Sequence, residues 1–355
     1  MKARLALESW KNIRFYVRIG IPSPQLAAVP GHQERPGRKS MLKPISFASV
    51  AVALVLNSVP SYAKELKSIG ISLGSLGNPF FVALSKGAEF EAKKINPNVK
   101  ITTVGFEYDL GKQVTQIDNF IAAGVDLILL NPGDPKAVGP AIKKAQAAGI
   151  IVVAVDTAAE GADATVTTNN VQAGEISCQY IVDKLGGKGD VIIQNGPQVS
   201  AVIDRVVGCK NVFSKNPDIK ILSSDQDAKG SREGGLTVAQ GYLTRFAKID
   251  AIFAINDPQA IGTDLAARQQ QRSGIIITAV DGAPDIEAAL KDPGTPQIQA
   301  SASQDPFFMA RRAVQVGVDI LNGHKPASAV ELLPSKLVTR DDVAEYKGWT
   351  SDRSQ

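Results

Sequence analysis

The sequence predicts an α/β protein made of two doubly wound lobes, each built on a parallel sheet, and three observations lead to this fold. Along residues 64–355, short apolar runs rich in Ile and Val alternate with amphipathic segments, which is the pattern of βαβ repetition. These runs are too many for one lobe. At "ATVTTNN" (164–170) strand-like residues run into a polar turn, where we place the first break between the lobes. The chain of 355 residues, 44% of them hydrophobic, is long enough to bury two cores.

The first 63 residues are interpreted as sequence outside the fold. The segment "MLKPISFASVAVALVLNSVPSYA" (41–63) has a basic start, an apolar stretch and a small-residue end, which predicts a signal peptide cleaved near Ala63-Lys64. An uncleaved membrane anchor is the alternative, which the shortness of the stretch disfavours. Residues 1–40 lack a hydrophobic period, and we interpret them as an artefactual extension before a start at Met41. We therefore expect the mature protein in the periplasm.

The charge of the folded part excludes a nucleic-acid or anionic-membrane surface as its main feature. The whole chain has 39 Lys and Arg and 35 Asp and Glu, with a net charge of +4. Residues 1–63 hold nine of the basic and two of the acidic residues, so residues 64–355 hold 30 and 33, a net charge of −3. A mildly acidic domain has no electrostatic attraction for polyanions.

The predicted strands are continuously apolar, as strands buried on both faces are. They lie at 67–73, 99–106, 125–130, 150–155, 190–195, 219–224, 249–255, 275–280 and 297–303. Helical patterns lie between them, for example at 113–124, 135–149 and 258–271, and several end at Gly. Parallel strands joined by helices imply right-handed crossovers.

No Ser/Gly-rich linker separates the lobes, so we expect a hinge of short strand crossings. We assign the first lobe to residues 64–168 plus 304–333. We assign the second lobe to residues 169–303 plus 334–355.

Polar side chains follow nearly every predicted strand, where open parallel sheets bind ligands. The residues in question are Asn78, Asp156, Asn256-Asp257, Asp281 and Gln304, together with Asn131 and Asp134. Any one of them taken alone is better explained as a helix cap or turn former, and we assign that role to Asn131 and Asp134. A ring of amides and carboxylates, however, offers donors and acceptors together, which suits a ligand with many hydroxyl groups.

Two aromatic residues open the first predicted helix in "GSLGNPFF" (74–81). Sugar rings have apolar C–H faces, which aromatic rings cover while polar groups hold the hydroxyl edge. Phe80 and Phe81 are therefore candidate ligand contacts. The alternative is that they belong to the core, which we expect for at most one of them.

The residues needed for common enzyme chemistries are missing from residues 64–355. His324 is the single histidine there and lies in the polar turn "NGHKP", so no His-centred triad is indicated. No Cys/His cluster has metal-ligand spacing, and no GxxxxGK[ST] loop occurs. Gly74 and Gly77 follow a strand but lack the tight G-x-G pair of a dinucleotide site. We predict a binding protein without catalytic residues, cofactor or metal.

The two cysteines, Cys178 and Cys209, both lie in the part predicted to be exported. An oxidising compartment favours a disulfide between them, closing a loop of about 30 residues that stabilises by roughly 3–4 kcal/mol. Two buried free thiols are the alternative.

The chain resembles the periplasmic sugar-binding proteins of ABC importers, of the ribose-binding type, over residues 66–340. The segments that carry the resemblance are "GNPFF" (77–81), "LILLNPGDPKAVGPAI" (127–142), "VVAVDT" (152–157), "AVIDRVVGCKNVF" (201–213), "AIFAINDPQAIG" (251–262), "AVDGAPD" (279–285) and "ASASQDP" (300–306). It implies the type I periplasmic binding fold, with two lobes joined by three crossings that close on a sugar. It implies a ligand ring of Asn78, Phe80, Phe81, Asp156, Arg205, Asn256, Asp281 and Gln304.

Two departures from the family pattern bear on the ligand. Thr157 stands where ribose binders of this type have Arg, and "DAKGSREGG" (227–235) lacks the aromatic expected from the second lobe. We therefore keep Thr157 as a candidate site residue and expect a monosaccharide or sugar alcohol other than ribose. The resemblance further implies a monomer that delivers its ligand to an inner-membrane ABC permease. A sugar-sensing protein that serves a chemoreceptor or sensor kinase is the alternative.

Overall fold

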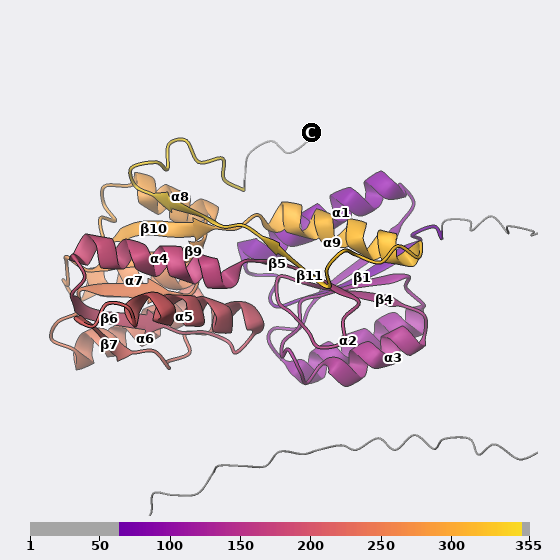
Figure 1. The fold of residues 1–355 in the computed structure, drawn as a ribbon, viewed down its shortest axis with the longest axis horizontal. Coiled ribbons are helices and arrows are strands. Elements are labelled where there is room, and N and C mark those ends of the chain that lie inside the picture. The colour runs from indigo at the N-terminus through magenta and orange to yellow at the C-terminus, as the bar shows by residue number, and fades with distance from the viewer. Residues whose placement is uncertain (1–63, 350–355) are drawn as a thin grey trace, which may run out of the picture. The chain divides into compact units, whose positions relative to one another are not determined.

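The computed structural model describes residues 64–349, which form two α/β lobes (Figure 1). The predicted extension (1–40) and signal peptide (41–63) lie outside the described residues, as do residues 350–355. None of the helices within 64–349 has both the length and the apolar composition needed to cross a bilayer.

The first lobe is built on a six-stranded sheet in which every neighbouring pair is parallel. Its strand order is β11-β5-β4-β3-β1-β2. The strands are β1 (Ser68–Leu73), β2 (Lys100–Gly105), β3 (Leu127–Leu130), β4 (Ile151–Val155), β5 (Ala164–Thr168) and β11 (Val330–Leu333).

The second lobe repeats this plan with one antiparallel edge strand. The order of its six strands is β12-β10-β9-β8-β6-β7, and only β12 runs antiparallel to its neighbour. The strands are β6 (Gly189–Gln194), β7 (Ile219–Ser223), β8 (Ala251–Ala254), β9 (Ile276–Asp281), β10 (Ile298–Ser303) and β12 (Lys336–Thr339). The predicted fold class is thus confirmed.

Helices cover both faces of each sheet (Figure 1). In the first lobe, α1 and α9 pack on one face and α2 and α3 on the other; in the second, α4 and α5 oppose α6, α7 and α8. The helices are α1 (Pro79–Ile95), α2 (Leu110–Ala123), α3 (Gly139–Ala147), α4 (Asn170–Leu185), α5 (Ser200–Phe213), α6 (Arg232–Arg245), α7 (Asp257–Gln269), α8 (Pro284–Lys291) and α9 (Pro306–Leu321).

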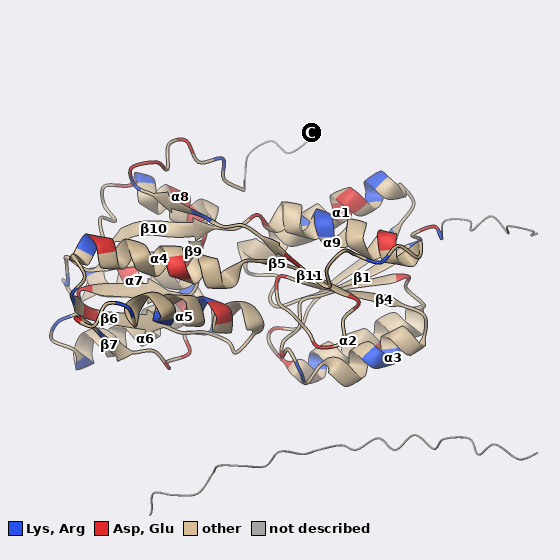
Figure 2. Cartoon of the chain, viewed as in Figure 1, with Lys and Arg blue, Asp and Glu red and all other residues tan. Residues whose placement is uncertain are grey.

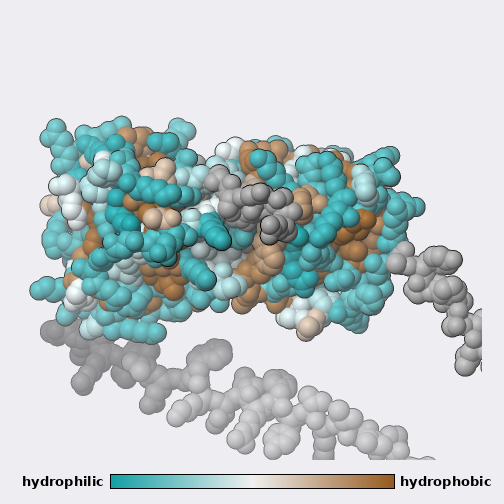
Figure 3. Space-filling view, turned by 90° about the horizontal axis from the view of Figure 1, so that it is seen from above, coloured by the Kyte–Doolittle hydropathy of each residue, from teal (hydrophilic) through white to brown (hydrophobic). Residues whose placement is uncertain are grey.

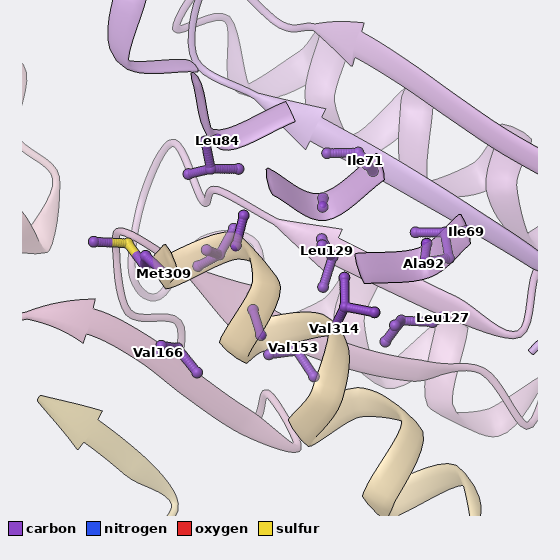
Figure 4. Close-up of a cluster of buried hydrophobic side chains, with 14 of the residues drawn as sticks. Ile69, Ile71, Leu84, Ala92, Leu127, Leu129, Val153, Val166, Met309 and Val314 are labelled. Carbon is purple, nitrogen blue, oxygen red and sulfur yellow. The ribbon is translucent and has the colours of Figure 1, made fainter. Parts of the chain in front are cut away.

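The core of the first lobe includes α9, which packs on a sheet whose strands lie mostly much earlier in the chain. Met309 and Val314 of α9 project between strand residues such as Leu129 and Val153 (Figure 4). All four of these side chains are fully buried. Gly87 lets α9 approach α1, because a Cβ at this position would lie 2.2 Å from the carbonyl oxygen of Phe307. Burial of apolar surface on this scale is the main stabilising term of such a lobe.

Two expectations about strands were wrong. The segments 99–106 and 219–224 were expected to be buried on both faces, but they form β2 and β7, which are edge strands with exposed residues. The short strands β11 and β12 were not predicted, because "VELL" and "KLVT" are four-residue segments with mixed polarity. Each of these two strands completes one edge of a sheet.

The chain passes between the two sheets three times, after β5, after β10 and after β11. These crossings touch one another. Thr168 Oγ1 donates to Gln304 Oε1 at 2.6 Å, and Ser335 Oγ donates to the carbonyl oxygen of Ser303 at 2.8 Å. The crossings therefore form one connected hinge rather than three independent linkers.

Charges are distributed without strong segregation. In the view of Figure 2, Lys and Arg are interspersed with Asp and Glu along the helices of both lobes. The face shown in Figure 3 is mostly hydrophilic, with hydrophobic atoms in separated areas. In these views, charges of one sign dominate neither lobe.

Candidate functional site

The carboxyl ends of both sheets border a cleft that contains two chambers. The inner chamber, of about 50 Å³, is lined by Asn78, Phe80, Phe81, Tyr108, Asp156, Pro197, Val199, Ala201, Val202, Arg205, Gly230, Ile255, Asn256, Asp281 and Gln304. A larger outer chamber of about 540 Å³ shares Asn78, Tyr108, Gly230 and Asp281 with it. Eight of the nine candidate ligand residues thus meet at the inner chamber, although they come from six separate parts of the sequence.

Thr157 is the ninth candidate, and it does not line either chamber. Its side chain is buried behind Asp156, where Oγ1 accepts a hydrogen bond from Asn131 Nδ2 at 2.8 Å and donates to the carbonyl oxygen of Pro132 at 3.2 Å. The short hydroxyl side chain therefore supports the loop after β4 from inside the lobe.

Asn131 has a role that differs from the predicted turn or cap. It is buried, and Nδ2 donates to Asp156 Oδ2 at 2.9 Å as well as to Thr157. Because it follows β3, next to β4 in the sheet, its amide reaches the carboxylate of the neighbouring strand end. Asp134 does act as expected, since its Oδ1 accepts from the backbone N–H groups of Lys136 and Ala137.

The first turn of α1 places both phenylalanines at the cleft. Asn78 is the N-cap, and its Oδ1 accepts from the N–H of Phe80 at 3.0 Å, while Pro79 occupies the first helical position. The helix therefore starts directly after the turn that follows β1, and its first two side chains cover the strand end.

Both phenyl rings also belong to the hydrophobic core of the first lobe, so the expectation of at most one core ring was wrong. Each is 4% exposed. The two rings meet edge to face, with centroids 5.4 Å apart, and Phe80 also contacts Trp349 at 5.8 Å. Gly74 makes room for Phe81, because a Cβ there would lie 2.8 Å from its ring. The rings are thus packed and rigid on one side while lining the inner chamber on the other.

Two carboxylates, Asp156 after β4 and Asp281 at the end of β9, face the chamber from the two lobes. Both have positive φ angles, 67° and 144°, which non-glycine residues rarely adopt. Burial raises the pKa of Asp156 to about 7; the Arg205 charge opposes this shift, and the Asp281 charge adds to it. Burial likewise raises the pKa of Asp281 to about 6, against the lowering effect of Arg205. Both acids therefore hold protons more tightly than in water.

Arg205 is the cation of this cluster, and it is 4% exposed. From α5, its Nε donates to Asn170 Oδ1 at 2.9 Å, and its Nη1 donates to the carbonyl oxygen of Ile255 at 2.8 Å. Nη1 also lies 3.6 Å from Asp281 Oδ1. Within residues 64–349 no hydrogen bond from Nη2 is recorded, so this nitrogen keeps its donor capacity while the other two hold the guanidinium in place.

The side-chain amides of Asn256 and Gln304 form hydrogen bonds with other groups of the protein. Asn256 caps α7 through the N–H of Gln259 and donates to the carbonyl oxygen of Gly230. Gln304 donates to Asp281 Oδ1 at 2.7 Å and accepts from Thr168 at the hinge. Asn256 thereby fixes the segment at Gly230, and Gln304 connects Asp281 to the hinge at Thr168.

Sequence reasoning missed Tyr108 and the supporting role of Asp257. Tyr108 lines both chambers, and the pKa of its hydroxyl is raised by burial and by the charges of Asp156 and Asp281. It follows β2, so the search for residues after strands could have found it, but that search considered only amides and carboxylates.

Asp257 is 1% exposed and lies beneath Asp281, accepting from the N–H of Ala283 at 2.7 Å and from Ser301 Oγ at 2.6 Å. The sequence shows it directly after Asn256, and the predicted ligand ring does not include it. Burial, together with the Asp281 charge, raises its pKa. These bonds hold the loop that directly follows Asp281.

The arrangement is suited to binding. Exposed His324 lies away from the cleft in the turn after α9, and within residues 64–349 no group of three or more His, Cys, Asp or Glu side chains could hold a metal ion. The inner chamber instead combines aromatic surface with buried acceptors and one strong donor.

The chain is similar to known binding proteins over most of its length. Residues 69–325 match the family described as periplasmic binding protein domain. The ribose import binding protein of Bacillus subtilis is 34% identical over 291 residues, covering 79% of this chain and 92% of that protein. A xylitol-binding protein of Mycolicibacterium smegmatis is 31% identical over 231 residues, covering 64% and 65%.

A solved structure extends the comparison. An ABC transporter solute-binding protein from Mycobacterium smegmatis with bound glycerol aligns with a TM-score of 0.74 and 28% identity, covering 81% of this chain and 99% of that one. The chain therefore belongs to the periplasmic binding protein domain family, whose members are substrate-binding proteins.

Proposed function

We propose that this member of the family is the exported solute-binding component of an ABC sugar importer and holds a neutral monosaccharide or polyol in the inner chamber. The observation that carries the proposal is the buried pair of Arg205 and Asp281 beside Asp156 and the two phenyl rings. A polyol both donates and accepts hydrogen bonds, so it can satisfy acceptors and donor together. An anionic ligand would instead meet two carboxylates.

Closure of the two lobes would complete the site, since residues on both lobes line one chamber. The backbone N–H of Ala158 already donates to Ser200 Oγ across the cleft at 2.7 Å. The connected crossings offer a hinge for this motion, and Gln304 links them to Asp281.

The ligand is proposed to differ from ribose. Thr157 points away from the chamber, so nothing at this position replaces the arginine of ribose binders. On the second lobe, Ala228 is buried and Lys229 pairs with Asp227, so residues 228–231 supply no aromatic ring. Tyr108 supplies a ring from the first lobe instead, which changes the outline of the cleft.

The proposals of export and of a permease partner are supported by the sequence and by similarity to known proteins. The segment 41–63 is a predicted signal peptide, and several relatives are named as import proteins. An inner-membrane ABC permease is the partner this implies. N-terminal sequencing of the protein from the exported fraction should give Lys64 as the first residue; a chain that retains residues 41–63 would contradict cleavage.

A thermal-shift screen tests the ligand class. Purified protein is heated with D-ribose, D-allose, xylitol, myo-inositol or glycerol, and the midpoint of unfolding is recorded. A ligand that binds only the folded state raises this midpoint with concentration. At least one monosaccharide or polyol should do so in the native protein and not in Asp281→Ala. Failure of every neutral sugar and polyol, with a shift caused by a charged solute, would overturn the proposal.

A further inference from the structure

The disulfide of the second lobe lies one helical turn from the arginine of the inner chamber. The predicted bond between Cys178 and Cys209 is confirmed, with Cα atoms 5.2 Å apart and both side chains fully buried. Cys209 follows Arg205 by four residues on α5, so the two side chains leave the same face of that helix. Cys178 lies on α4, and the first residue of α4 is Asn170, which accepts the hydrogen bond from Arg205 Nε. The bridge therefore joins α5, which carries the guanidinium, to α4, which orients it. The two helices lie side by side in the second lobe (Figure 1).

Two glycines bring the backbones of α4 and α5 into direct contact. A Cβ at Gly174 would lie 2.1 Å from the carbonyl oxygen of Arg205, and one at Gly208 would lie 2.1 Å from the carbonyl oxygen of Val171. Glycine surfaces set how near two helices come, but they have no side chains that interlock and prevent sliding. The disulfide supplies a third point of attachment, and this one is covalent.

The hydrogen bonds of Arg205 would weaken if α5 shifted even slightly along α4. Its bonds to Asn170 and to the carbonyl oxygen of Ile255 are 2.9 and 2.8 Å long, and such bonds weaken beyond about 3.2 Å. One partner lies on α4 and the other at the end of β8, so a shift of α5 along α4 would stretch at least the first. The orientation of the guanidinium in the inner chamber therefore depends on the position of α5 relative to α4.

We propose that the Cys178–Cys209 disulfide positions Arg205 for ligand recognition by fixing α5 against α4. This proposal rests on the proposed function, because it assumes that Arg205 contacts the ligand. A bridge that acts only on the unfolded chain would raise stability and leave affinity unchanged. A positioning bridge changes affinity, and it does so only while the arginine is present.

A double-mutant cycle separates these two roles. The variants are Cys178→Ala/Cys209→Ala, Arg205→Met and the triple variant, titrated by calorimetry with the panel member that gives native protein its largest thermal shift. Loss of the cysteines should weaken binding about tenfold with Arg205 present and less than about twofold with Met present, since coupled residues are not additive. Equal losses in both backgrounds would overturn the positioning role.

A matched control removes the general effect of stability. Leu243 is 4% exposed on α6, in the hydrophobic cluster on the opposite face of the second sheet. Leu243→Ala should lower the melting temperature and leave Kd within about twofold, because its site shares no partners with Arg205. If it weakened binding as much as the cysteine variant, the disulfide would have no special relation to the arginine.

A measurement without ligand keeps the test separate from the proposed function. The ¹⁵N–¹H signal of Arg205 Nε, assigned by its absence in Arg205→Met, reports the hydrogen bond to Asn170. It should be protected from exchange in the disulfide form and lose protection at least tenfold in the dithiol form, refolded under reducing conditions. Unchanged protection in the dithiol form would contradict positioning, whereas failure of the whole ligand panel would contradict only the proposed ligand class.

Discussion

The two walls of the inner chamber are built on different principles. The aromatic wall, comprising Phe80, Phe81 and Tyr108, is packed: both phenylalanines belong to the core of the first lobe. The polar wall, comprising Arg205, Asn256, Asp281 and Gln304, is hydrogen-bonded, and its partners reach α4, β8 and the hinge. Packing determines the shape of the aromatic wall. In the polar wall, the buried charges of Arg205 and Asp281 are stabilised by each other and by their hydrogen-bond partners.

This difference predicts that the polar wall is the more sensitive to substitution. Removing one member of a buried charged pair leaves the other uncompensated, whereas trimming a packed ring loses apolar contacts and leaves a small cavity.

Arg205→Ala and Asp281→Ala should each weaken binding by about 3–5 kcal/mol, because the remaining charge stays buried without its partner. Isothermal titration with the best panel ligand measures the loss. Lys229→Ala is the matched control: this cation also lines the cleft, but its side chain is 73% exposed and pairs with Asp227. Its loss should stay below about 1 kcal/mol. Equal effects at Arg205 and Lys229 would remove the contrast between the walls.

Part of the pH dependence of stability should be traceable to Asp156, while the raised pKa values of Asp281 and Asp257 act in the same direction. Its pKa in the folded protein is raised to about 7, so between about pH 4 and 7 the folded state binds a proton that the unfolded state releases. The stability contributed by this proton is present at low pH and is lost as pH rises, at up to about 1.4 kcal/mol per pH unit.

Asp156→Asn has no carboxyl group to titrate at this position, so its stability should fall less steeply between pH 5 and 7. Urea unfolding of ligand-free protein at pH 5, 6 and 7 measures the slope. Asp134→Asn is the control, since that carboxylate lies on the surface and its pKa is lowered by the N–H groups of Ala137 and Lys136. An Asp156→Asn slope equal to that of the native protein would contradict the raised pKa.

Ribose should bind at least tenfold more weakly than the best ligand. Ribose would leave buried acceptors beside Asp156 unpaired, because Thr157 faces Asn131 and Pro132 rather than the chamber, and each such acceptor costs about 1–3 kcal/mol. A competition titration of ribose against the best panel ligand measures the ratio. Ribose as the tightest ligand would show that Tyr108 or Lys229 replaces the missing contacts.

Phe80→Leu should have the smallest effect on affinity, about 1 kcal/mol, close to what an aromatic contact adds beyond its area. Because the ring also packs on Phe81 and Trp349, the melting temperature should fall as well. Phe90→Leu serves as control: its ring packs on Phe307, away from the chamber, so Kd should not change. A loss at Phe80 larger than that at Arg205 would reverse the account of the two walls.

The sequence was sufficient for those parts of the fold and site that depend on local pattern. Apolar runs and the residues after them led to the two sheets and to Asn78, Asp156, Asn256, Asp281 and Gln304. Arg205 could be suspected only through family resemblance, because "VIDRVV" by itself indicates an exposed helical charge.

What the sequence could not predict depends on contacts between distant segments. Asn131 resembles a turn residue until β3 and β4 are placed side by side. The orientation of Thr157 follows from that same contact, and the strands β11 and β12 are defined by the sheet edges they complete. Both phenylalanines are core residues because the first turn of α1 lies against α9 and Trp349, which are remote in the chain.

A crystal structure of the complex with the best panel ligand would show whether the inner chamber is the binding site. The account predicts one ligand in the inner chamber, with a ring or carbon chain against Phe80 and Phe81. Its hydroxyl groups should contact Arg205 Nη2 and the carboxylates of Asp156 and Asp281. A ligand held in the outer chamber without contact to Arg205 or Asp281 would contradict it.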